Sequence, residues 1–350
     1  DPAELGLEPP AATVTLETAD GSRTLLLGGE VAVTGDRIVT LEGAERAWTT
    51  EGEIHAEVAR PPGNWRSRDV LHLAAADVAR LAVSGTGREA PLAIERLAEE
   101  SFRLSAPVED VADRDRVRRV LSELATLQVA RFVDDLSVLE EDPGLEPPRF
   151  VVELEPAEGQ GVPETLTIGA SAGLDRVYAR VGEQAFEAEA ADLADMLGRP
   201  LAWWRSHLAT DRQIFELAQV RVLSPDDDEM TLARADPEWT RDGEPIPYAS
   251  VRELLLTLTG LAADEIVTAT EARAFGLPRG EPTVTFVLVP EASETEAEEE
   301  TIVVYDDPGQ GVILAPGGRD VLLRVTEEAW LPVEEALAGV REARPVGEGG

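Results

Sequence analysis

Short runs in which apolar and polar residues alternate recur along the chain, and they predict half-buried antiparallel strands. The clearest runs form three groups, each entered by a Gly-Leu turn and a strand, at residues 6–18, 144–156 and 276–288. A second strand follows in each group, at 23–29, 164–170 and 300–306, and further short strands come after it. Glycine, proline and aspartate separate these strands, as turns require. The pattern therefore predicts three small antiparallel sheet units.

The turn that opens each group is itself repeated. Gly-Leu-Glu-Pro-Pro at 6–10 returns at 144–148, and Gly-Leu-Pro opens the third group at 276–278. Glycine gives a helix-to-strand turn its backbone freedom, and proline holds the chain extended while preventing a helix from continuing. An acidic helical stretch closes the second and third groups, at 191–198 and 326–340.

A different segment lies between the sheet units, and it occurs twice. Residues 65–68 read Trp-Arg-Ser-Arg and residues 204–207 read Trp-Arg-Ser-His, and without a gap both continue to strands at 77–83 and 216–222. The register therefore holds for nineteen positions. Each copy then has an aromatic residue, a proline, a helix start and a leucine-rich helix. In the first copy these are Phe102, Pro107, Asp113 and residues 117–129. In the second they are Trp239, Pro245, Ser250 and residues 251–263. We call these segments strand-plus-helix units, and expect Asp113 and Ser250 to be N-caps.

The predicted fold class is α+β, a tandem repeat of antiparallel sheet units that alternate with strand-plus-helix units. Small units of this length are marginal alone, so we expect neighbours to bury shared surface. The first sheet unit has no strand-plus-helix unit before it, so we expect the chain to begin within a longer protein. The expected boundaries are 1–62, 143–201 and 275–343 for sheet units, 63–142 and 202–274 for strand-plus-helix units, and 344–350 for a flexible tail.

Composition narrows the classes of partner. Among 350 residues, 69 are acidic and 31 basic, all of them arginine, which gives a net charge of −38. This charge repels a phosphate backbone, so nucleic acid is not expected as a partner. The chain has no cysteine, which excludes disulfides and thiol chemistry. Residues 1–10 read as neither a signal nor an anchor, so we expect any anchor to have been removed.

Several motifs resemble catalytic or metal-binding patterns. Residues 169–173 fit G-x-S-x-G around Ser171, but a strand rather than a helix is expected next, which favours a hairpin turn over a hydrolase. The three histidines, His55, His72 and His207, do not have the spacing of a zinc site. We therefore predict no catalytic residues, no metal and no cofactor.

Two short stretches are candidates for binding. Acidic residues Asp226, Asp227, Asp228 and Glu229 cluster in one predicted turn and offer oxygen ligands to a cation such as Ca²⁺, although they do not fit an EF-hand. Trp203 and Trp204 offer flat apolar surfaces to a sugar or a partner helix. The alternatives are a hydrated hairpin tip and packing between consecutive units.

The repeated pattern resembles the bacterial domain of unknown function 4340 family. The residues that carry the likeness are Phe102, Pro107, 117–127, 144–148, 166–169 and 178–180, together with their counterparts in the other copies. Members of that family are typically tethered by one N-terminal membrane helix, lie outside the cytoplasmic membrane, and are often encoded near ABC-transporter components of the kind linked to gliding motility. The resemblance supplies no catalytic residues.

The resemblance and the repeats together imply a non-enzymatic extracytoplasmic scaffold or accessory subunit of a membrane protein complex. Its expected partners are membrane proteins such as ABC-transporter components, and its only expected contact with the membrane is an N-terminal anchor that this chain lacks. A module that binds polysaccharide or a cation is the alternative, and a hydrolase using Ser171 is the third hypothesis.

Overall fold

The computed structural model describes residues 1–350 except 99–100, 140, 226–227, 236–237, 292–298 and 346–350. The chain divides into two compact units, Asp1–Arg68 and Asp69–Gly350, which we call unit 1 and unit 2. Both consist mainly of antiparallel strands, with helices in addition. The predicted α+β class with repeated sheet units is thus confirmed.

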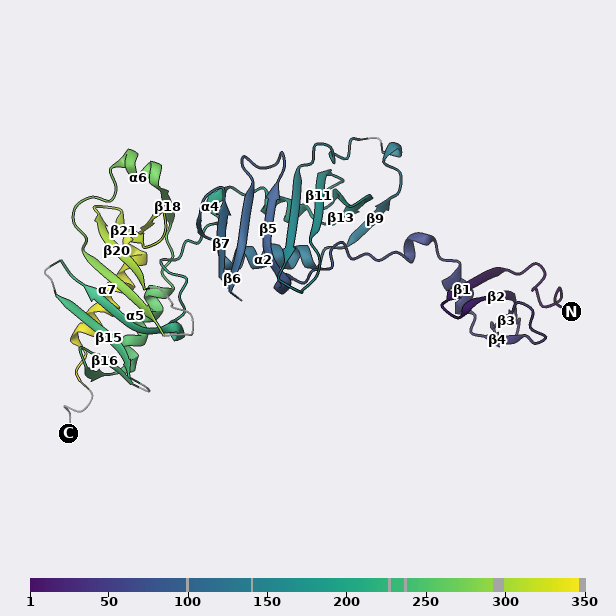
Figure 1. Ribbon diagram of the computed structural model, residues 1–350, viewed down its shortest axis with the longest axis horizontal. Helices are drawn as coiled ribbons and strands as arrows, with labels where there is room; N and C mark the ends of the chain where they lie inside the picture. Colours follow the sequence, from purple (N-terminus) through teal and green to yellow (C-terminus); the bar gives the residue numbers. More distant parts are fainter. Residues whose placement is uncertain (99–100, 140, 226–227, 236–237, 292–298, 346–350) are drawn as a thin grey trace. The chain divides into compact units, whose positions relative to one another are not determined.

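Unit 1 contains one four-stranded antiparallel sheet in the order β1-β2-β3-β4 (Figure 1). Its single α-helix in the described chain is α1 (Glu53–Val58), and a 3₁₀ turn, η1 (Pro62–Asn64), follows it. The strands are β1 (Ala12–Thr18), β2 (Gly21–Glu30), β3 (Arg37–Leu41) and β4 (Trp48–Thr50).

The first half of unit 2 is built on a nine-stranded sheet in the order β8-β7-β6-β5-β10-β11-β12-β13-β9. Every neighbouring pair in it is antiparallel. The strands are β5 (Val78–Ser84), β6 (Leu92–Ala98), β7 (Ser101–Ala106), β8 (Asp110–Val111), β9 (Val129–Val133), β10 (Phe150–Pro156), β11 (Glu164–Ser171), β12 (Val177–Val181) and β13 (Gln184–Ala188). Its helices are η2 (Ala75–Asp77), α2 (Arg114–Ala125), η3 (Leu136–Val138), α3 (Ala191–Leu197) and α4 (Leu201–Trp204).

The second half repeats this sheet strand for strand, in the order β17-β16-β15-β14-β19-β20-β21-β22-β18. The strands are β14 (Leu217–Leu223), β15 (Glu229–Ala235), β16 (Glu238–Arg241), β17 (Glu244–Ile246), β18 (Glu265–Thr268), β19 (Val284–Pro290), β20 (Glu300–Asp307), β21 (Gly311–Pro316) and β22 (Val321–Val325). The helices are η4 (Ile214–Glu216), α5 (Tyr248–Thr259), α6 (Ala269–Phe275) and α7 (Glu327–Glu342).

Each nine-stranded sheet joins two of the segments that the sequence distinguishes. Strand β5 of the segment 63–142 pairs with β10 of the segment 143–201, and β14 pairs with β19 in the same way. The last strand of each strand-plus-helix segment, β9 or β18, pairs at the far edge with β13 or β22. In each of these two pairs, the strand-plus-helix segment and the sheet segment that follows it are therefore halves of one sheet and share one core.

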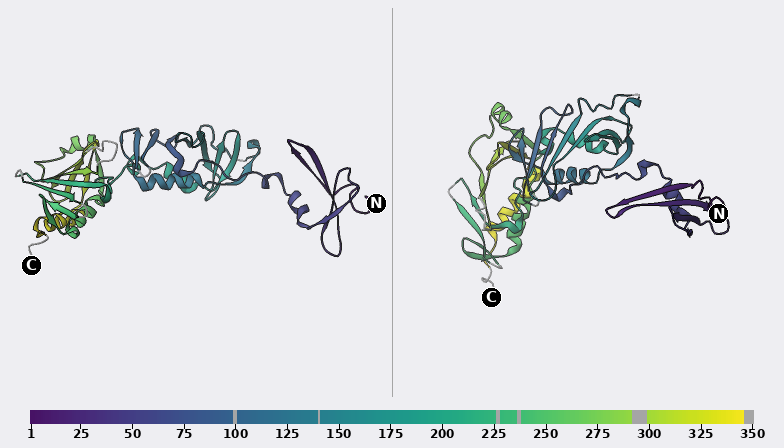
Figure 2. Two further views of the ribbon diagram at one scale, coloured as in Figure 1. Left: turned by 60° about the horizontal axis from the view of Figure 1, so that its bottom comes forward. Right: turned by 45° about the vertical axis from the view of Figure 1, so that its right-hand side comes forward.

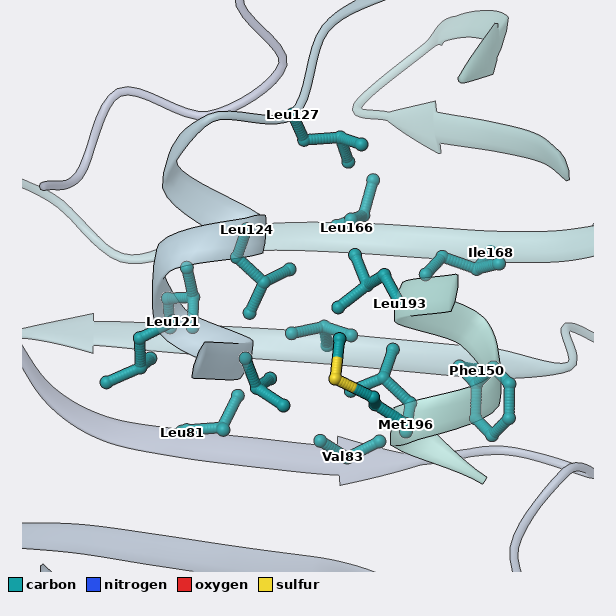
Figure 3. Packing of buried hydrophobic residues seen from close by; sticks show 14 of the residues in the cluster. Leu81, Val83, Leu121, Leu124, Leu127, Phe150, Leu166, Ile168, Leu193 and Met196 are labelled. Atoms are coloured by element: carbon teal, nitrogen blue, oxygen red, sulfur yellow. The ribbon is translucent and has the colours of Figure 1, made fainter. Parts of the chain in front are cut away.

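Helices cover one face of each nine-stranded sheet, because their apolar stripes need an apolar partner. In the first sheet, α2 and α3 point leucine and methionine side chains at β5, β10 and β11 (Figure 3). In the second, α5 and α7 pack against each other and contribute to a second core (Figure 2). Helices α2 and α5 are both twelve residues long and bury the same four positions: Val117, Val120, Leu121 and Leu124 in α2, and Val251, Leu254, Leu255 and Leu258 in α5.

Two local predictions need correction. Asp113 is the N-cap of α2 and accepts a hydrogen bond from the Arg116 backbone N–H, whereas α5 begins two residues before Ser250, after Pro247. The prediction that prolines keep the entry turns extended is wrong for the first two copies. There Leu7 forms a β-bridge with Pro10, and Leu145 forms one with Pro148, around cis prolines. Among the described residues, only the third copy enters from a helix, with Gly276 as the left-handed C-cap of α6.

Candidate interaction surface

Corresponding positions in the three four-stranded units can be read from the strand registers. Leu27, Ile168 and Val304 occupy one position, since each pairs with the equivalent residue of the strand before and after it. In the two later units the face that carries this position is buried beneath helices. Its buried residues include Phe150, Val152, Leu154 and Phe186 in one unit, and Val284, Phe286, Leu288 and Leu323 in the other.

The same face of unit 1 is buried in its middle, at Leu27 and Val39, and uncovered towards its ends. At the position of Leu154 and Leu288 stands Leu16, which is 63% exposed. At the position of Phe186 and Leu323 stands Trp48, which is 51% exposed. Leu41 is exposed as well, and α1 buries none of its own residues. A large tryptophan and two leucines thus lie on a surface where the other units have core, as protein-binding surfaces do.

The edge strand of this face also differs from its counterparts. Strands β10 and β19 are central strands, because β5 and β14 pair with their outer edges. In the described part of the chain, β1 pairs with β2 alone. Its other edge therefore presents backbone N–H and C=O groups that can accept a further strand. We call β1 together with Leu16, Leu41 and Trp48 the open face of unit 1.

Trp65 and Trp204, which the sequence aligns, have opposite environments. Trp204 is fully buried in the core of the first nine-stranded sheet, whereas Trp65 is 64% exposed. The environment, not the local sequence, sets this difference.

The tryptophans named as a binding surface lie mainly inside the protein. Trp204 has no exposed surface, so it is a core residue, and burial prevents it from offering a face to a sugar. Trp203 is partly buried and packs edge-to-face on Trp204, with 4.9 Å between ring centroids. The Arg116 guanidinium lies over the Trp203 ring and donates a hydrogen bond of 2.6 Å to its carbonyl oxygen. These contacts pack α4 against α2.

The acidic turn is only partly described. Asp226 and Asp227 lie outside the described residues, Asp228 is an exposed turn residue, and Glu229 begins β15. Within the described part of the chain, no three histidine, aspartate or glutamate side chains are grouped to hold a metal ion. Cation binding by this turn stays a prediction.

The remaining motif residues have local partners. The Ser171 hydroxyl donates to the Gly173 carbonyl oxygen at 2.6 Å in the turn after β11. His72 lies 3.0 Å from Glu164 through Nδ1, and His207 Nδ1 lies 3.1 Å from the Ala263 carbonyl oxygen. The described geometry thus does not bring Ser171 to a histidine.

A buried ionic cluster connects the two nine-stranded sheets of unit 2. The fully buried carboxylate of Asp110 lies 2.7 Å from Nε of Arg319 and 2.8 Å from Nε of Arg205. Arg319 also donates hydrogen bonds to the carbonyl oxygens of Ser206 and Leu208. Because one buried charge here meets two of opposite sign, its removal would leave uncompensated charges, which is costly. The cluster is best explained as the joint between consecutive repeats.

A small cavity of about 230 Å³ adjoins this joint, and Asp211 and His207 are among the residues that line it. Burial raises the pKa of the Asp211 carboxyl, and it also raises the pKa of the Glu300 carboxyl. The Asp211 carboxylate accepts a hydrogen bond from the Ser206 hydroxyl at 3.3 Å, and Glu300 accepts one from Thr210 at 2.7 Å. Each of these two carboxyls therefore has a hydroxyl partner beside the joint.

Comparison with known protein families agrees with the repeat. The model of a family described as a domain of unknown function, DUF4340, matches residues 1–143 and again residues 103–279. The chain belongs to the DUF4340 family. Each match includes one four-stranded unit and the strand-plus-helix segment that follows it. No curated protein and no solved structure matches the chain.

No described helix is both long and apolar enough to cross a bilayer. The sequence pattern did not predict the exposed residues Leu16 and Trp48 or the buried ion pair of Asp110 and Arg319 as site residues. Aligning the three units would have shown that Trp48 is apolar like Phe186, but not that it is exposed, because exposure depends on which neighbours cover it.

Proposed function

We propose that the protein is a non-enzymatic scaffold, an extracytoplasmic accessory subunit that binds a membrane protein complex of the ABC-transporter kind. The open face of unit 1 is the observation that carries this proposal. It exposes Leu16 and Trp48 at positions that are buried in both later repeats, and an edge of β1 that is unpaired in the described part of the chain. Surfaces of that composition serve protein association.

Family membership and charge support the assignment of the partner. The resemblance stated above implies an N-terminal membrane tether outside the cytoplasmic membrane and genes that are often encoded near ABC-transporter components. The net charge of −38 repels anionic lipid headgroups, so attraction to the lipid surface itself does not supply the membrane association. A protein partner in the membrane is then the simplest target for the open face.

The test is site-specific photo-crosslinking of the full chain in its host cell. A photoreactive residue is placed at Leu16, at Trp48, or at Phe215, which is at least as exposed as either but lies in unit 2 and serves as the control. We expect Leu16 and Trp48 to crosslink to the same integral membrane protein, identified by mass spectrometry, and Phe215 not to. If only soluble proteins are recovered, or if all three sites give the same products, the proposal fails.

Location is tested separately on intact cells stripped of their outer layers. Protease added from outside should degrade the chain while a cytoplasmic marker protein survives. Survival of the chain together with the marker would contradict an extracytoplasmic location and leave the binding result unaffected.

A further inference from the structure

The entry turn of the third four-stranded unit lies farther from its sheet than the turns of the first two. A Cβ on Gly144 would lie 2.9 Å from the backbone nitrogen of Ala170, and that nitrogen donates a hydrogen bond to the Pro143 carbonyl oxygen. Gly6 approaches the second strand of unit 1 in the same way. A Cβ on Gly276, the corresponding glycine, would meet no atom of the described chain within 4 Å apart from its neighbours. The third turn therefore does not close onto its strand.

The residues of β20 explain this distance. Tyr305 stands where the earlier second strands have Gly28 and Gly169, and at those glycines the turn leaves no space for a side chain. The pairing of β20 with β21 also continues without a register shift to Asp307 and Gly311, whereas the first two units have a shift there. A tyrosine side chain and a longer regular hairpin therefore occupy the place of the crossing.

A cavity of about 560 Å³ lies beside the displaced turn. Among the residues that line it are Phe275, Leu277 and Arg279 from the end of α6 and the turn, and Asp306 and Gln310 from the β20–β21 hairpin. Pockets of about 300–1,000 Å³ that combine apolar lining with a few polar groups are typical of small-ligand sites. Phe275 is 61% exposed, so its ring is available to an apolar ligand.

The acidic side chains on this face of the hairpin are already paired. The Asp307 carboxylate accepts a hydrogen bond of 3.1 Å from Nε of Arg324, and Glu265 forms an ion pair with the same guanidinium. Arg279 donates to the Phe275 carbonyl oxygen at 3.1 Å, and it has no acidic partner among the residues that the structure describes. The cavity therefore offers a ligand a guanidinium whose charge is not neutralised, and such a group binds carboxylates well.

Asp306 contributes a backbone donor rather than its carboxylate. Successive side chains of a strand point to opposite faces, so the Asp306 side chain lies on the face opposite Asp307, where it lines a second cavity. The Thr283 N–H donates to the Val304 carbonyl oxygen at 2.8 Å, and a strand directs the backbone groups of alternate residues to one side. The Asp306 N–H therefore points to the side of the entry turn. In the second four-stranded unit the equivalent N–H, that of Ala170, bonds to the turn.

We propose that this cavity binds a monocarboxylate with an apolar body. One carboxylate oxygen accepts a hydrogen bond from the Asp306 N–H, as the Pro143 carbonyl oxygen does from Ala170. The Arg279 guanidinium supplies the opposite charge, and the hydrocarbon part lies against Phe275.

The charge of the whole chain limits the ligand further. The net charge of −38 repels each added negative charge, so a single carboxylate is favoured over ligands with several, such as phosphates. A free organic acid and the carboxyl-terminal residue of a peptide offer the same chemistry, and the experiment distinguishes these two sources. The inference goes beyond the proposed function, because this site lies in unit 2 and does not involve the open face of unit 1.

The test is isothermal titration calorimetry of the full chain with hydrocinnamate, a carboxylate on a phenyl-bearing chain. Its neutral amide, hydrocinnamamide, has nearly the same shape and serves as the matched ligand. We expect the acid to bind about tenfold more tightly than the amide, because only the acid forms a charge-assisted bond with Arg279. In the NMR spectrum of the labelled chain, the acid should also shift the amide resonance of Asp306.

A capped dipeptide, N-acetyl-glycyl-phenylalanine, distinguishes the two sources of the carboxylate. Tighter binding of this peptide than of hydrocinnamate assigns the site to a peptide carboxyl terminus. Weaker binding of the peptide assigns it to a free organic acid.

Variants at two arginines make the outcome specific. Arg279→Gln keeps an amide donor but removes the charge, so it should lower the affinity for the acid about tenfold and leave the affinity for the amide unchanged. Arg273→Gln is the matched control, because Arg273 is an exposed arginine of α6 that does not line the cavity. It should leave both affinities unchanged. If Arg279→Gln lowers both affinities, Arg279→Lys decides: a retained preference for the acid supports the proposal, and a lost preference overturns it.

Three results overturn the inference. They are equal affinities of the native chain for acid and amide, an equal loss of acid binding in the Arg279→Gln and Arg273→Gln variants, and saturation with acid that leaves the Asp306 resonance unshifted. None of them bears on whether Leu16 and Trp48 crosslink to a membrane protein, so failure of this inference and failure of the proposed function are distinguishable.

Discussion

At the edge of each nine-stranded sheet, an ion pair occurs with its charges exchanged between the repeats. In the first sheet Arg131 of β9 faces Glu187 of β13, with Nε of the arginine 2.9 Å from the carboxylate. In the second sheet Glu265 of β18 faces Arg324 of β22 at the same positions. Opposite charges on facing positions stabilise a sheet whichever strand carries which sign. The duplicated fold therefore required the pairing at this position and left its polarity free.

The exchange predicts a specific pattern of stabilities. Arg131→Glu should lower the free energy of opening of β9 and β13 by about 1–3 kcal/mol, because the buried Glu187 loses one of its two arginine donors, keeps only Arg176, and gains a like charge. Adding Glu187→Arg should restore part of it, because the exchanged pair forms as in the second sheet but the new arginine lies beside Arg176. Hydrogen exchange measured on peptides from β9 and β13 gives both values, and peptides from β18 and β22 serve as the internal control. A double variant that is less stable than either single variant would contradict this explanation.

The same pair makes a pH prediction. The hydrogen bond from Arg131 lowers the pKa of Glu187 from its usual value, and burial opposes this only in part. A carboxyl whose pKa is lowered on folding contributes stability above its unfolded pKa, and that contribution is lost as the pH falls through the folded pKa. Protection of β9 and β13 should therefore fall below about pH 4.5 in the native chain. This fall should be weaker in Arg131→Ala, measured by the same exchange experiment.

At the scale of elements, the entry turn crosses a glycine of the second strand in the first two units. The Ala170 N–H donates to the Pro143 carbonyl oxygen at 2.7 Å, as the Gly29 N–H does to Leu5 at 2.8 Å. A Cβ on Gly169 would lie 2.1 Å from the Pro143 oxygen, and one on Gly28 would lie 2.5 Å from the Leu5 oxygen. In the third unit Tyr305 stands where the other strands have glycine, and Gly276 has open space beside it. The crossing is therefore a property of two copies rather than three.

We predict that Gly169→Ala destabilises the first nine-stranded sheet by about 2–4 kcal/mol, because the backbone of the turn must move to admit the methyl group. Gly339→Ala is the matched control: it has open space around it, lies within α7 and should gain about 0.5–1 kcal/mol. Denaturant unfolding followed by local hydrogen exchange measures both. Equal effects of the two substitutions would show that the crossing contact is not required.

Repeat comparison within the sequence was enough to predict most elements. Gap-free alignment places 77–83 on 216–222, and the structure has β5 and β14 there with burial patterns that differ only at the last residue. The predicted helix 117–129 ends earlier, at Ala125, because Leu127 and Val129 are drawn into the core and the start of β9. Pairing of β5 with β10 could not be read from the pattern, since alternation shows that a strand is half-buried but not which strand lies beside it. The open face was missed for the same reason.

At the scale of the whole molecule, unit 1 and unit 2 bury very different amounts of apolar surface. The buried hydrophobic side chains of unit 1 are Leu7, Leu27 and Val39. Unit 2 has two extended cores, each with buried residues from both a four-stranded unit and a strand-plus-helix segment. Because the hydrophobic effect scales with the apolar area removed from water, unit 1 should be the less stable of the two.

This difference predicts where the chain opens first. In hydrogen exchange of the full chain, β1–β4 should exchange faster than β5 and β10–β12, at a free energy lower by several kcal/mol. Leu27→Ala should abolish protection in unit 1 and leave β10–β12 unchanged, whereas Ile168→Ala, the same position in the next repeat, should do the reverse, each at a cost of about 2–5 kcal/mol. A ligand that binds the folded open face must slow exchange in β1, since it stabilises only the folded form. Protection of β1 equal to that of β10 in the free protein would contradict the predicted difference in stability. It would also mean that the open face of unit 1 is not a weakly stable surface.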